Sequence, residues 1–190
     1  MKALITGGTG FIGSHLAQAL LKDNYEVYCI VRNPLKLRFL QGLNVKIIQA
    51  DLSDKDSLKK IDWHFDYIFN LSGITKAKNK EEFYQSNYLG TKNLIETLVE
   101  ANPQVKRFVH VSSLAAVGPC RNGNPVDEKT SPTPVSEYGK SKLLGEKAVE
   151  SYKNKVSITI IRPPAVYGPR DSDFLTFFKM IKAGVVLYFT

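Results

Sequence analysis

The chain has 190 residues, 43% of them hydrophobic and 23% charged, and its formal net charge is +8 at pH 7. A chain of this size and composition can bury one sizeable hydrophobic core, and it contains no apolar run long enough to span a bilayer. The basic residues are scattered and accompany no nucleic-acid-binding motif, so the charge favours an anionic small ligand over nucleic acid.

Short apolar segments alternate with helical ones along the chain. The apolar segments predict strands over residues 2–6, 26–31, 45–48, 67–70, 107–111 and 157–161. Helices are predicted over residues 11–22, 35–40, 53–60 (capped by Ser53 or Asp54), 82–101 and 135–152, and a loop rich in glycine and proline over 118–134. This alternation is typical of parallel strands joined by crossover helices. We therefore predict an α/β fold, a doubly wound parallel sheet of the Rossmann type.

A glycine-rich turn follows the first predicted strand. Gly8, Gly10 and Gly13 have the spacing G-x-G-x-x-G, and Gly7 can replace Gly8 in a second register. Glycine permits a sharp turn and a close backbone approach, and the next helix directs its free N–H groups at an anion. With a strand before it and a helix after it, the turn predicts binding of a dinucleotide pyrophosphate. The alternative is a tight turn without a ligand.

Charged residues follow the second and third predicted strands. An acidic residue after the second strand would bind the ribose 2′-hydroxyl of NAD, but this chain has Arg32 there, with Lys36 and Arg38 close behind. A guanidinium suits a 2′-phosphate, so Arg32 favours NADP over NAD; a solvated surface arginine is the alternative. Asp51 is suited equally to accept a hydrogen bond from the adenine amino group and to cap the next helix.

Tyr138 and Lys142 lie four residues apart, on one face of a predicted helix. The pKa of free tyrosine is about 10, and a nearby ammonium favours the phenolate. The pair can therefore move a proton to or from a substrate oxygen while a hydride moves at carbon. Ser112 and Ser113 follow the fifth strand, where a hydroxyl can bind a substrate oxygen or satisfy the turn backbone.

Other kinds of chemistry are not favoured. The chain contains no G-x-S-x-G motif for nucleophilic hydrolysis, and we assign His110, inside a strand, to packing. Cys29 and Cys120 lack metal-ligand spacing and form no disulfide framework, so we predict no metal. A reducing compartment suits these cysteines and no signal-peptide pattern opens the chain, so we predict a cytoplasmic protein.

Seven segments resemble, in order, motifs of the extended short-chain dehydrogenase/reductase superfamily, the NAD(P)-dependent epimerases, dehydratases and related reductases. These segments are T-G-G-T-G-F-I-G at 6–13, D-L at 51–52, N-L-S-G at 70–73, N-Y-L-G-T at 87–91, V-S-S at 111–113, Y-G-K-S-K at 138–142 and R-P-P-A-V-Y-G-P at 162–169. The resemblance covers essentially the whole chain. It departs from the usual pattern at Ser72, where the family element N-x-A-G has alanine.

The resemblance implies a role for each motif. Tyr138 would be the general acid/base, Lys142 its electrostatic partner and a ribose ligand, and Ser113 the donor to the substrate oxygen. The cofactor-binding residues it implies, besides Tyr138 and Lys142, are Gly7, Gly10, Phe11, Ile12 and Gly13 at the pyrophosphate, and Asp51, Leu52, Leu71, Ser72, Gly73, Asn87, Pro163 and Val166 elsewhere.

Two features of the serine segment distinguish this chain within the family. Leu114 and Ala115 stand where sugar 4,6-dehydratases often carry Asp and Glu, and Val117 replaces a common tyrosine. Together with Arg32 they favour an NADP-dependent oxidoreductase acting on a small carbonyl or hydroxyl compound, similar to dihydroflavonol reductase or hydroxysteroid dehydrogenase. The alternatives are a nucleotide-sugar epimerase using bound NAD and a non-catalytic dinucleotide-binding or redox-sensing module.

Members of this branch usually continue well beyond 190 residues. The resemblance therefore implies a dinucleotide-binding domain over 1–162 and only the beginning of a substrate domain over 163–190, with a helix at 174–181 and an apolar tail at 185–190. We expect a C-terminally truncated chain that can hold the cofactor but lacks most of the substrate pocket, and such a fragment can be inactive. A homodimer through the long helices is usual in the family.

Overall fold

The computed structural model describes residues 1–102, 104–120, 123 and 125–185. Residues 186–190, most of the predicted apolar tail, lie outside the described residues. No helix within the described part of the chain is both long and apolar enough to cross a bilayer.

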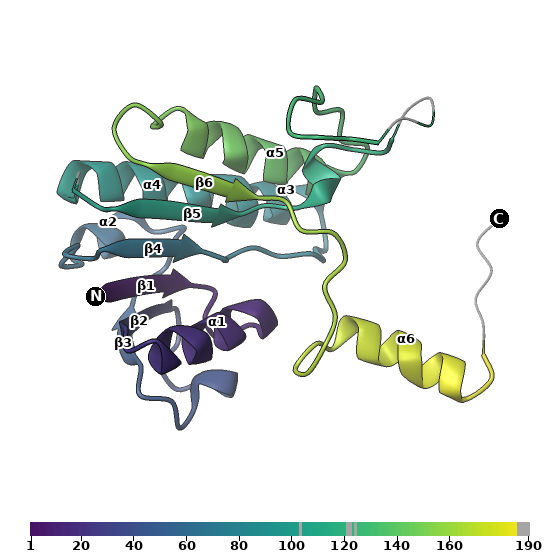
Figure 1. The fold of residues 1–190 in the computed structure, drawn as a ribbon, viewed down its shortest axis with the longest axis horizontal. Coiled ribbons are helices and arrows are strands. Elements are labelled where there is room, and N and C mark those ends of the chain that lie inside the picture. The colour runs from purple at the N-terminus through teal and green to yellow at the C-terminus, as the bar shows by residue number, and fades with distance from the viewer. Residues whose placement is uncertain (103, 121–122, 124, 186–190) are drawn as a thin grey trace.

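Six parallel strands form one sheet, as predicted. They are β1 (Lys2–Thr6), β2 (Glu26–Val31), β3 (Lys46–Gln49), β4 (Tyr67–Asn70), β5 (Arg107–Val111) and β6 (Ile158–Ile161). Their order is β3-β2-β1-β4-β5-β6 (Figure 1). The chain builds outward from β1 to β3 and then returns to the other side of β1 with β4. A crevice therefore opens at the carboxyl ends of β1 and β4, the place where open α/β sheets bind ligands.

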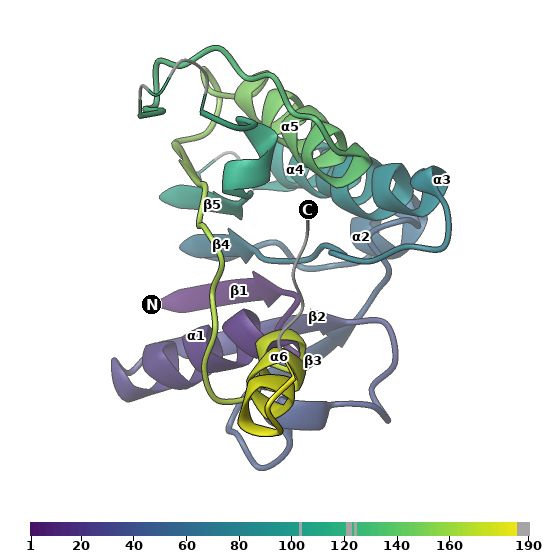
Figure 2. The ribbon, with the colours of Figure 1, turned by 90° about the vertical axis from the view of Figure 1, so that its right-hand side faces the viewer.

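Helices cover both faces of the sheet. Helix α1 (Phe11–Lys22) lies on one face, and α2 (Lys55–Lys59), α4 (Gly90–Ala101) and α5 (Glu137–Glu150) lie on the other (Figure 2). The strands alternate accordingly: Leu4 belongs to the core cluster under α4, whereas Ala3 and Ile5 belong to the cluster under α1. All three side chains are fully buried. A shift of the strand by one residue would exchange the two faces, so this burial fixes its register.

Two predicted helices differ from the observed ones, and one short helical turn was not predicted. The predicted helix 82–101 is α3 (Lys80–Phe83), a π-helical turn η2 (Tyr84–Leu89) and α4 in succession. The prediction of a helix at 35–40 was wrong except for the 3-10 turn η1 (Arg38–Leu40), because Arg38 has a φ of +52°, outside the α-helical region. A short 3-10 turn, η3 (Leu114–Ala116), follows β5 without a sequence signal.

The segment after β6 leaves the sheet and crosses to α1. There the Pro169 carbonyl lies 2.8 Å from His15 Nε2, and Arg170 donates to Ser14 Oγ at 3.0 Å and to Gln18 Oε1 at 2.9 Å. The chain then forms α6 (Asp173–Lys182), which lies in front of the carboxyl edge of the sheet (Figure 2). The segment thus forms one wall of the crevice. The domain boundary at residue 162 stays a prediction.

A buried ion pair fixes the end of β6 to α5. Arg162 donates through Nε to Glu146 Oε1 at 2.9 Å and through Nη2 to Oε2 at 2.6 Å. The Glu146 side chain is 1% exposed and that of Arg162 is 22% exposed. A bidentate pair satisfies both carboxylate oxygens, which makes burial of this charge tolerable.

Removing one partner of this pair should destabilise the fold. Arg162→Met leaves the Glu146 carboxylate buried and unpaired, so we expect the free energy of unfolding in urea to fall by about 3 kcal/mol. The double variant Glu146→Leu/Arg162→Met removes both charges and should recover most of that loss. A single variant as stable as the parent chain would contradict this assignment.

Candidate active site

Two cavities lie at the carboxyl edge of the sheet and join into one groove. The first, of about 810 Å³, contains Ser113 and Tyr138 in its wall, and we call it the Tyr138 cavity. The second, of about 820 Å³, contains Arg32, and we call it the Arg32 cavity. The residues common to both walls are Gly7, Gly10, Arg38, Leu71, Gly73 and Ile74.

Every residue that the sequence predicts for the site lines this groove. The Tyr138 cavity is lined by Gly7, Gly10, Phe11, Ile12, Gly13, Leu71, Gly73, Asn87, Ser113, Tyr138, Lys142, Pro163 and Val166. The Arg32 cavity is lined by Arg32, Asp51, Leu52 and Ser72, besides the shared residues. The structure therefore brings together residues that lie up to 159 positions apart in sequence, from Gly7 to Val166. The individual roles assigned to them stay predictions.

The glycine turn forms a cradle that side chains would fill. Gly7 has a φ of +71°, and a Cβ there would lie 2.8 Å from the carbonyl carbon of Leu71. A Cβ on Gly13 would lie 2.3 Å from the Gly7 carbonyl oxygen. Gly10 begins α1 without a side-chain cap, so the N–H groups of the first helical turn stay open to an anion. The cradle fits a phosphate group.

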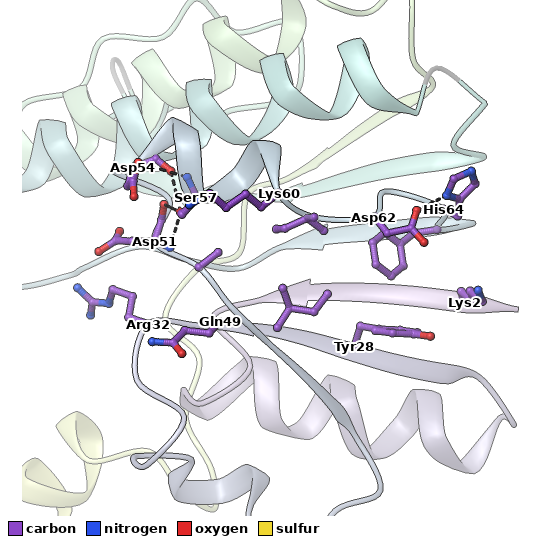
Figure 3. A pocket seen from close by; sticks show the side chains of 14 residues that line it. Lys2, Tyr28, Arg32, Gln49, Asp51, Asp54, Ser57, Lys60, Asp62 and His64 are labelled. Atoms are coloured by element: carbon purple, nitrogen blue, oxygen red, sulfur yellow. Dashed lines mark hydrogen bonds and ion pairs between the residues drawn. The ribbon is translucent and has the colours of Figure 1, made fainter.

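The far end of the Arg32 cavity is polar. Asp51 Oδ1 accepts hydrogen bonds from Ser53 N at 2.9 Å and Ser53 Oγ at 2.8 Å. The cap of α2 is instead Asp54, which accepts from Asp56 N and Ser57 N. Of the two roles considered for Asp51, helix capping thus belongs to Asp54. Figure 3 shows Arg32 and Asp51 at the same end of a third cavity, which continues from here over β2 and β3.

Arg32 is exposed, and its guanidinium makes no hydrogen bond or ion pair with the described residues. A second cation, Arg38, lines both cavities. Its guanidinium lies 5.2 Å from the centre of the Phe39 ring, and that of Arg170 lies 5.5 Å from the same ring. In the sequence, Arg38 is a cation close behind Arg32, but it is not among the predicted site residues. Arg170 carries no sequence signal, because only tertiary contact brings it to α1.

Ser113 both caps η3 and lines the Tyr138 cavity. Its Oγ accepts a hydrogen bond from Ala115 N at 3.2 Å, so both functions considered for it are compatible. Since the oxygen accepts from the backbone, its own proton is available for a ligand in the cavity. Ser112 differs: its Oγ is buried and has no hydrogen-bond partner among the described residues.

Tyr138 lies in the first turn of α5. Ser136 caps this helix by accepting from Gly139 N at 3.0 Å. The Tyr138 ring centre lies 5.9 Å from that of Phe83, which holds the ring from the α3 side. A Cβ on Gly139 would lie 2.3 Å from the Ala115 carbonyl oxygen, so α5 begins in close contact with the serine segment. Ser113 and Tyr138 consequently face one cavity.

Lys142 lies one turn further along α5 and is only 4% exposed. Its Nζ donates to the Val111 carbonyl at 2.8 Å, directly before the serine segment. Burial lowers the pKa of Lys142 to about 8, against a smaller opposing effect of Glu146. Lys142 is thus a desolvated amine, four residues after Tyr138 on α5.

Asn87 holds the site together from the π-helical turn. Its Oδ1 accepts from Ile74 N at 2.9 Å, and its Nδ2 donates to Ile74 O at 3.1 Å and to Ser141 Oγ at 3.0 Å. Ser141 Oγ in turn donates to the Tyr138 carbonyl at 2.7 Å. These bonds use both amide protons of Asn87. Its side chain therefore joins the loop after β4 to α5.

His110, inside β5, lines neither cavity of the groove. His110 is fully buried, its Nδ1 lies 3.1 Å from Asn70 Nδ2, and burial lowers its pKa to about 3. It is therefore neutral and packed inside the sheet. Among the residues that the structure describes, no three His, Cys, Asp or Glu side chains group as metal ligands would.

Known proteins resemble this chain in both sequence and fold. It is 33% identical over 183 residues to ceramide reductase of Caulobacter vibrioides, covering 96% of this chain and 52% of that protein. It is 32% identical over 173 residues to a putative dihydroflavonol 4-reductase of Synechocystis sp., covering 88% and 50%. The UDP-glucuronic acid 4-epimerase of Bacillus cereus, solved with NAD, superposes with a TM-score of 0.81 at 31% identity, covering 97% and 63%.

The chain spans about half the length of the curated relatives it matches. The sequence profile that describes the NAD dependent epimerase/dehydratase family matches residues 3–187, nearly the entire chain. The strand order, the glycine cradle between β1 and β4, and the Ser113–Tyr138–Lys142 cavity agree with that match. The chain belongs to the NAD dependent epimerase/dehydratase family.

Proposed function

We propose that the chain forms the cofactor-binding part of an NADP-dependent oxidoreductase, which transfers a hydride between the nicotinamide and a small carbonyl or hydroxyl compound. One observation carries this proposal. Ser113, Tyr138 and Lys142 line one end of a groove whose glycine cradle lies in the middle and whose other end holds Arg32. The proton-transfer residues, the glycine cradle and the cation therefore lie in the same order as the nicotinamide, the pyrophosphate and the 2′-phosphate of a dinucleotide.

The position of each residue in the groove indicates which part of the cofactor it would hold. The open N–H groups of α1 and the Gly7–Gly13 cradle suit the pyrophosphate, because a helix N-terminus stabilises an anion. Asp51 accepts hydrogen bonds at Oδ1 from Ser53 and keeps Oδ2 for the adenine amino group. Lys142 lines the same cavity as Tyr138 at the opposite end of the groove and would bind ribose hydroxyls there.

When bound, the reduced cofactor supplies the hydride that a carbonyl carbon accepts. Ser113 donates a hydrogen bond to the carbonyl oxygen with the proton that its backbone contact leaves free. Tyr138 gives its hydroxyl proton to that oxygen as negative charge develops there. The Lys142 ammonium stabilises the tyrosinate that remains, and a proton from solvent restores Tyr138. The net reaction converts a carbonyl, a reduced cofactor and one proton into an alcohol and an oxidised cofactor.

The cations of the Arg32 cavity favour NADP as this cofactor. Arg32 offers an exposed guanidinium without a protein partner, and Arg38 offers a second one from η1. A guanidinium binds a phosphate through two parallel hydrogen bonds. Neither the carboxyl end of β2 nor the turn that follows it, residues 32–37, contains the carboxylate that a ribose 2′-hydroxyl would require. The reductases named among the relatives support reduction as the reaction.

A nucleotide-sugar epimerase using NAD is the second candidate. The superposition on UDP-glucuronic acid 4-epimerase, solved with NAD, supports it. The Tyr138–Lys142 pair would serve that reaction equally, since epimerisation also begins with hydride removal at a hydroxyl-bearing carbon. Arg32 in place of an acidic residue argues for the reductase. A non-catalytic module would not need Ser113, Tyr138 and Lys142 in one cavity.

Cofactor preference should depend on the two arginines. We expect NADPH to bind at least about tenfold more tightly than NADH, since each charged hydrogen bond to phosphate contributes roughly 1.5–3 kcal/mol. Arg32→Ala and Arg38→Ala should each reduce the affinity for NADPH and leave that for NADH within about twofold. Isothermal titration calorimetry of both cofactors measures this, with Lys36→Ala as control. A preference for NADH would contradict the NADP assignment.

Turnover should depend on pH through Lys142. The pKa of Lys142 is lowered to about 8, so its ammonium is present below that pH and is lost as the pH rises through it. We therefore expect the rate of carbonyl reduction to fall above about pH 8, by roughly tenfold per pH unit. The pH profile of kcat in the full-length protein measures this.

Tyr138→Phe separates the role of the tyrosine hydroxyl from that of Lys142 in this pH profile. It removes only the hydroxyl and should lower kcat by at least about 10²-fold at every pH while NADPH stays bound. Undiminished turnover by this variant would remove Tyr138 from the proposed role, and a rate that holds constant to pH 10 would remove Lys142.

A further inference from the structure

An ion pair crosses the groove where its two cavities meet. Lys76 Nζ, in the wall of the Arg32 cavity, lies 2.7 Å from Asp173 Oδ1, in the wall of the Tyr138 cavity. Lys76 belongs to the loop after β4, and Asp173 is the first residue of α6, which lies in front of the carboxyl edge of the sheet (Figure 2). The pair therefore joins two walls that are 97 residues apart in sequence.

The loop that carries Lys76 is bonded to the chain on both sides of this residue. Two residues before Lys76, Ile74 N donates to Asn87 Oδ1 at 2.9 Å. Two residues after it, Lys78 N donates to Glu82 Oε2 at 3.0 Å. These hydrogen bonds fix the backbone on which Lys76 stands.

Asp173 is positioned by the segment that crosses to α1. Its backbone N–H donates to Asp171 Oδ1 at 3.0 Å, and that of Phe174 donates to Asp171 Oδ2 at 2.9 Å. Just before this turn, Arg170 donates to Ser14 Oγ on α1 at 3.0 Å. The start of α6 is therefore fixed relative to the glycine cradle, from which α1 begins. With both backbones held, only the two side chains have to move for the ion pair to open.

The pair is exposed to solvent, with 77% of the Lys76 side chain and 49% of the Asp173 side chain accessible. Water competes for both charges of such a pair, so it is weak and can open without unfolding of the chain. The proposed cofactor would lie behind it, because the pyrophosphate belongs at Gly7 and Gly10, which line both cavities. A molecule that occupies both cavities has to pass between Lys76 and Asp173 to enter or leave the groove.

We propose that the Lys76–Asp173 ion pair is a gate that opens for each entry and each release of the dinucleotide. This inference rests on the proposed function, in which the oxidised cofactor is exchanged for a reduced one after every turnover. Both partners belong to the chain, and neither bonds to the cofactor. The gate therefore slows entry and release by the same factor and leaves the affinity unchanged.

Two neutral variants, Lys76→Met and Asp173→Asn, test the gate. Stopped-flow nicotinamide fluorescence gives the rate constant for association of NADPH with the chain and, after mixing with excess NADP⁺, that for its dissociation. The ionic strength is 0.15 M, at which charges more than about 8 Å apart are largely screened. We expect both rate constants to rise about two- to fivefold in either variant, as the loss of an exposed ion pair allows, and Kd to stay within about twofold.

The control variants separate the pair from its single charges. Lys78→Met removes the same charge two residues away, from a side chain that lines none of the three cavities described above, and should change neither rate constant. Lys76→Asp/Asp173→Lys rebuilds the pair with exchanged charges and should return both rate constants to within about twofold of the parent values. NADH should show the same pattern, because the gate lies at the pyrophosphate and not at the 2′-phosphate.

A direct contact between Lys76 and a phosphate would give a different pattern. Lys76→Met would then raise the dissociation rate constant alone and weaken binding, whereas Asp173→Asn would free Lys76 for the phosphate and slow dissociation. That pattern, unchanged rate constants in both variants, or rate constants that stay high in the exchanged pair would overturn the gate and leave the oxidoreductase standing. If neither NADPH nor NADH binds, the proposed function fails as well.

Discussion

The groove depends on a contact between the ends of β1 and β4. The backbone at Gly7 passes so close to Leu71 and Ser72 that a Cβ would lie within 2.9 Å of both. Buried hydrogen bonds maintain this approach: Thr6 Oγ1 donates to Asn70 Oδ1 at 2.7 Å and accepts from Ser72 N at 3.2 Å. Because these strands diverge into crossovers on opposite faces, the same contact opens the crevice that the ligand needs.

The crevice also positions the Tyr138 end of the groove. The loop that leaves β4 is bonded to Asn87, and Asn87 is bonded to Ser141 on α5. The serine segment at the end of β5 is joined to the same helix by the hydrogen bond from Lys142 to Val111. These side-chain bonds connect three elements that meet at the carboxyl edge. The position of Tyr138 relative to the glycine cradle therefore depends on hydrogen bonds along the whole edge.

Sequence reasoning anticipates the parts of this arrangement that local patterns encode. The strands and the glycine turn follow from apolar periodicity and from backbone freedom, and the strand ends bring the predicted site residues to one edge. The π-helical turn 84–89 leaves no mark in the apolar spacing, so the sequence indicates one continuous helix at 82–101. Arg38 reaches the groove because its backbone adopts a left-handed φ. Arg170 reaches it because the segment after β6 crosses to α1. The burial that lowers the pKa of Lys142 is likewise a tertiary effect.

Transfer of the hydride itself tests the central claim most directly. The protein is incubated with NADPH that carries deuterium at both C4 positions of the nicotinamide and with a simple ketone, 2-octanone, and the alcohol is examined by mass spectrometry. The account predicts 2-octanol one mass unit heavier than the product formed with unlabelled NADPH, with the deuterium on the carbinol carbon. An alcohol without deuterium, or no alcohol from a full-length protein that has NADPH and 2-octanone bound, would contradict it.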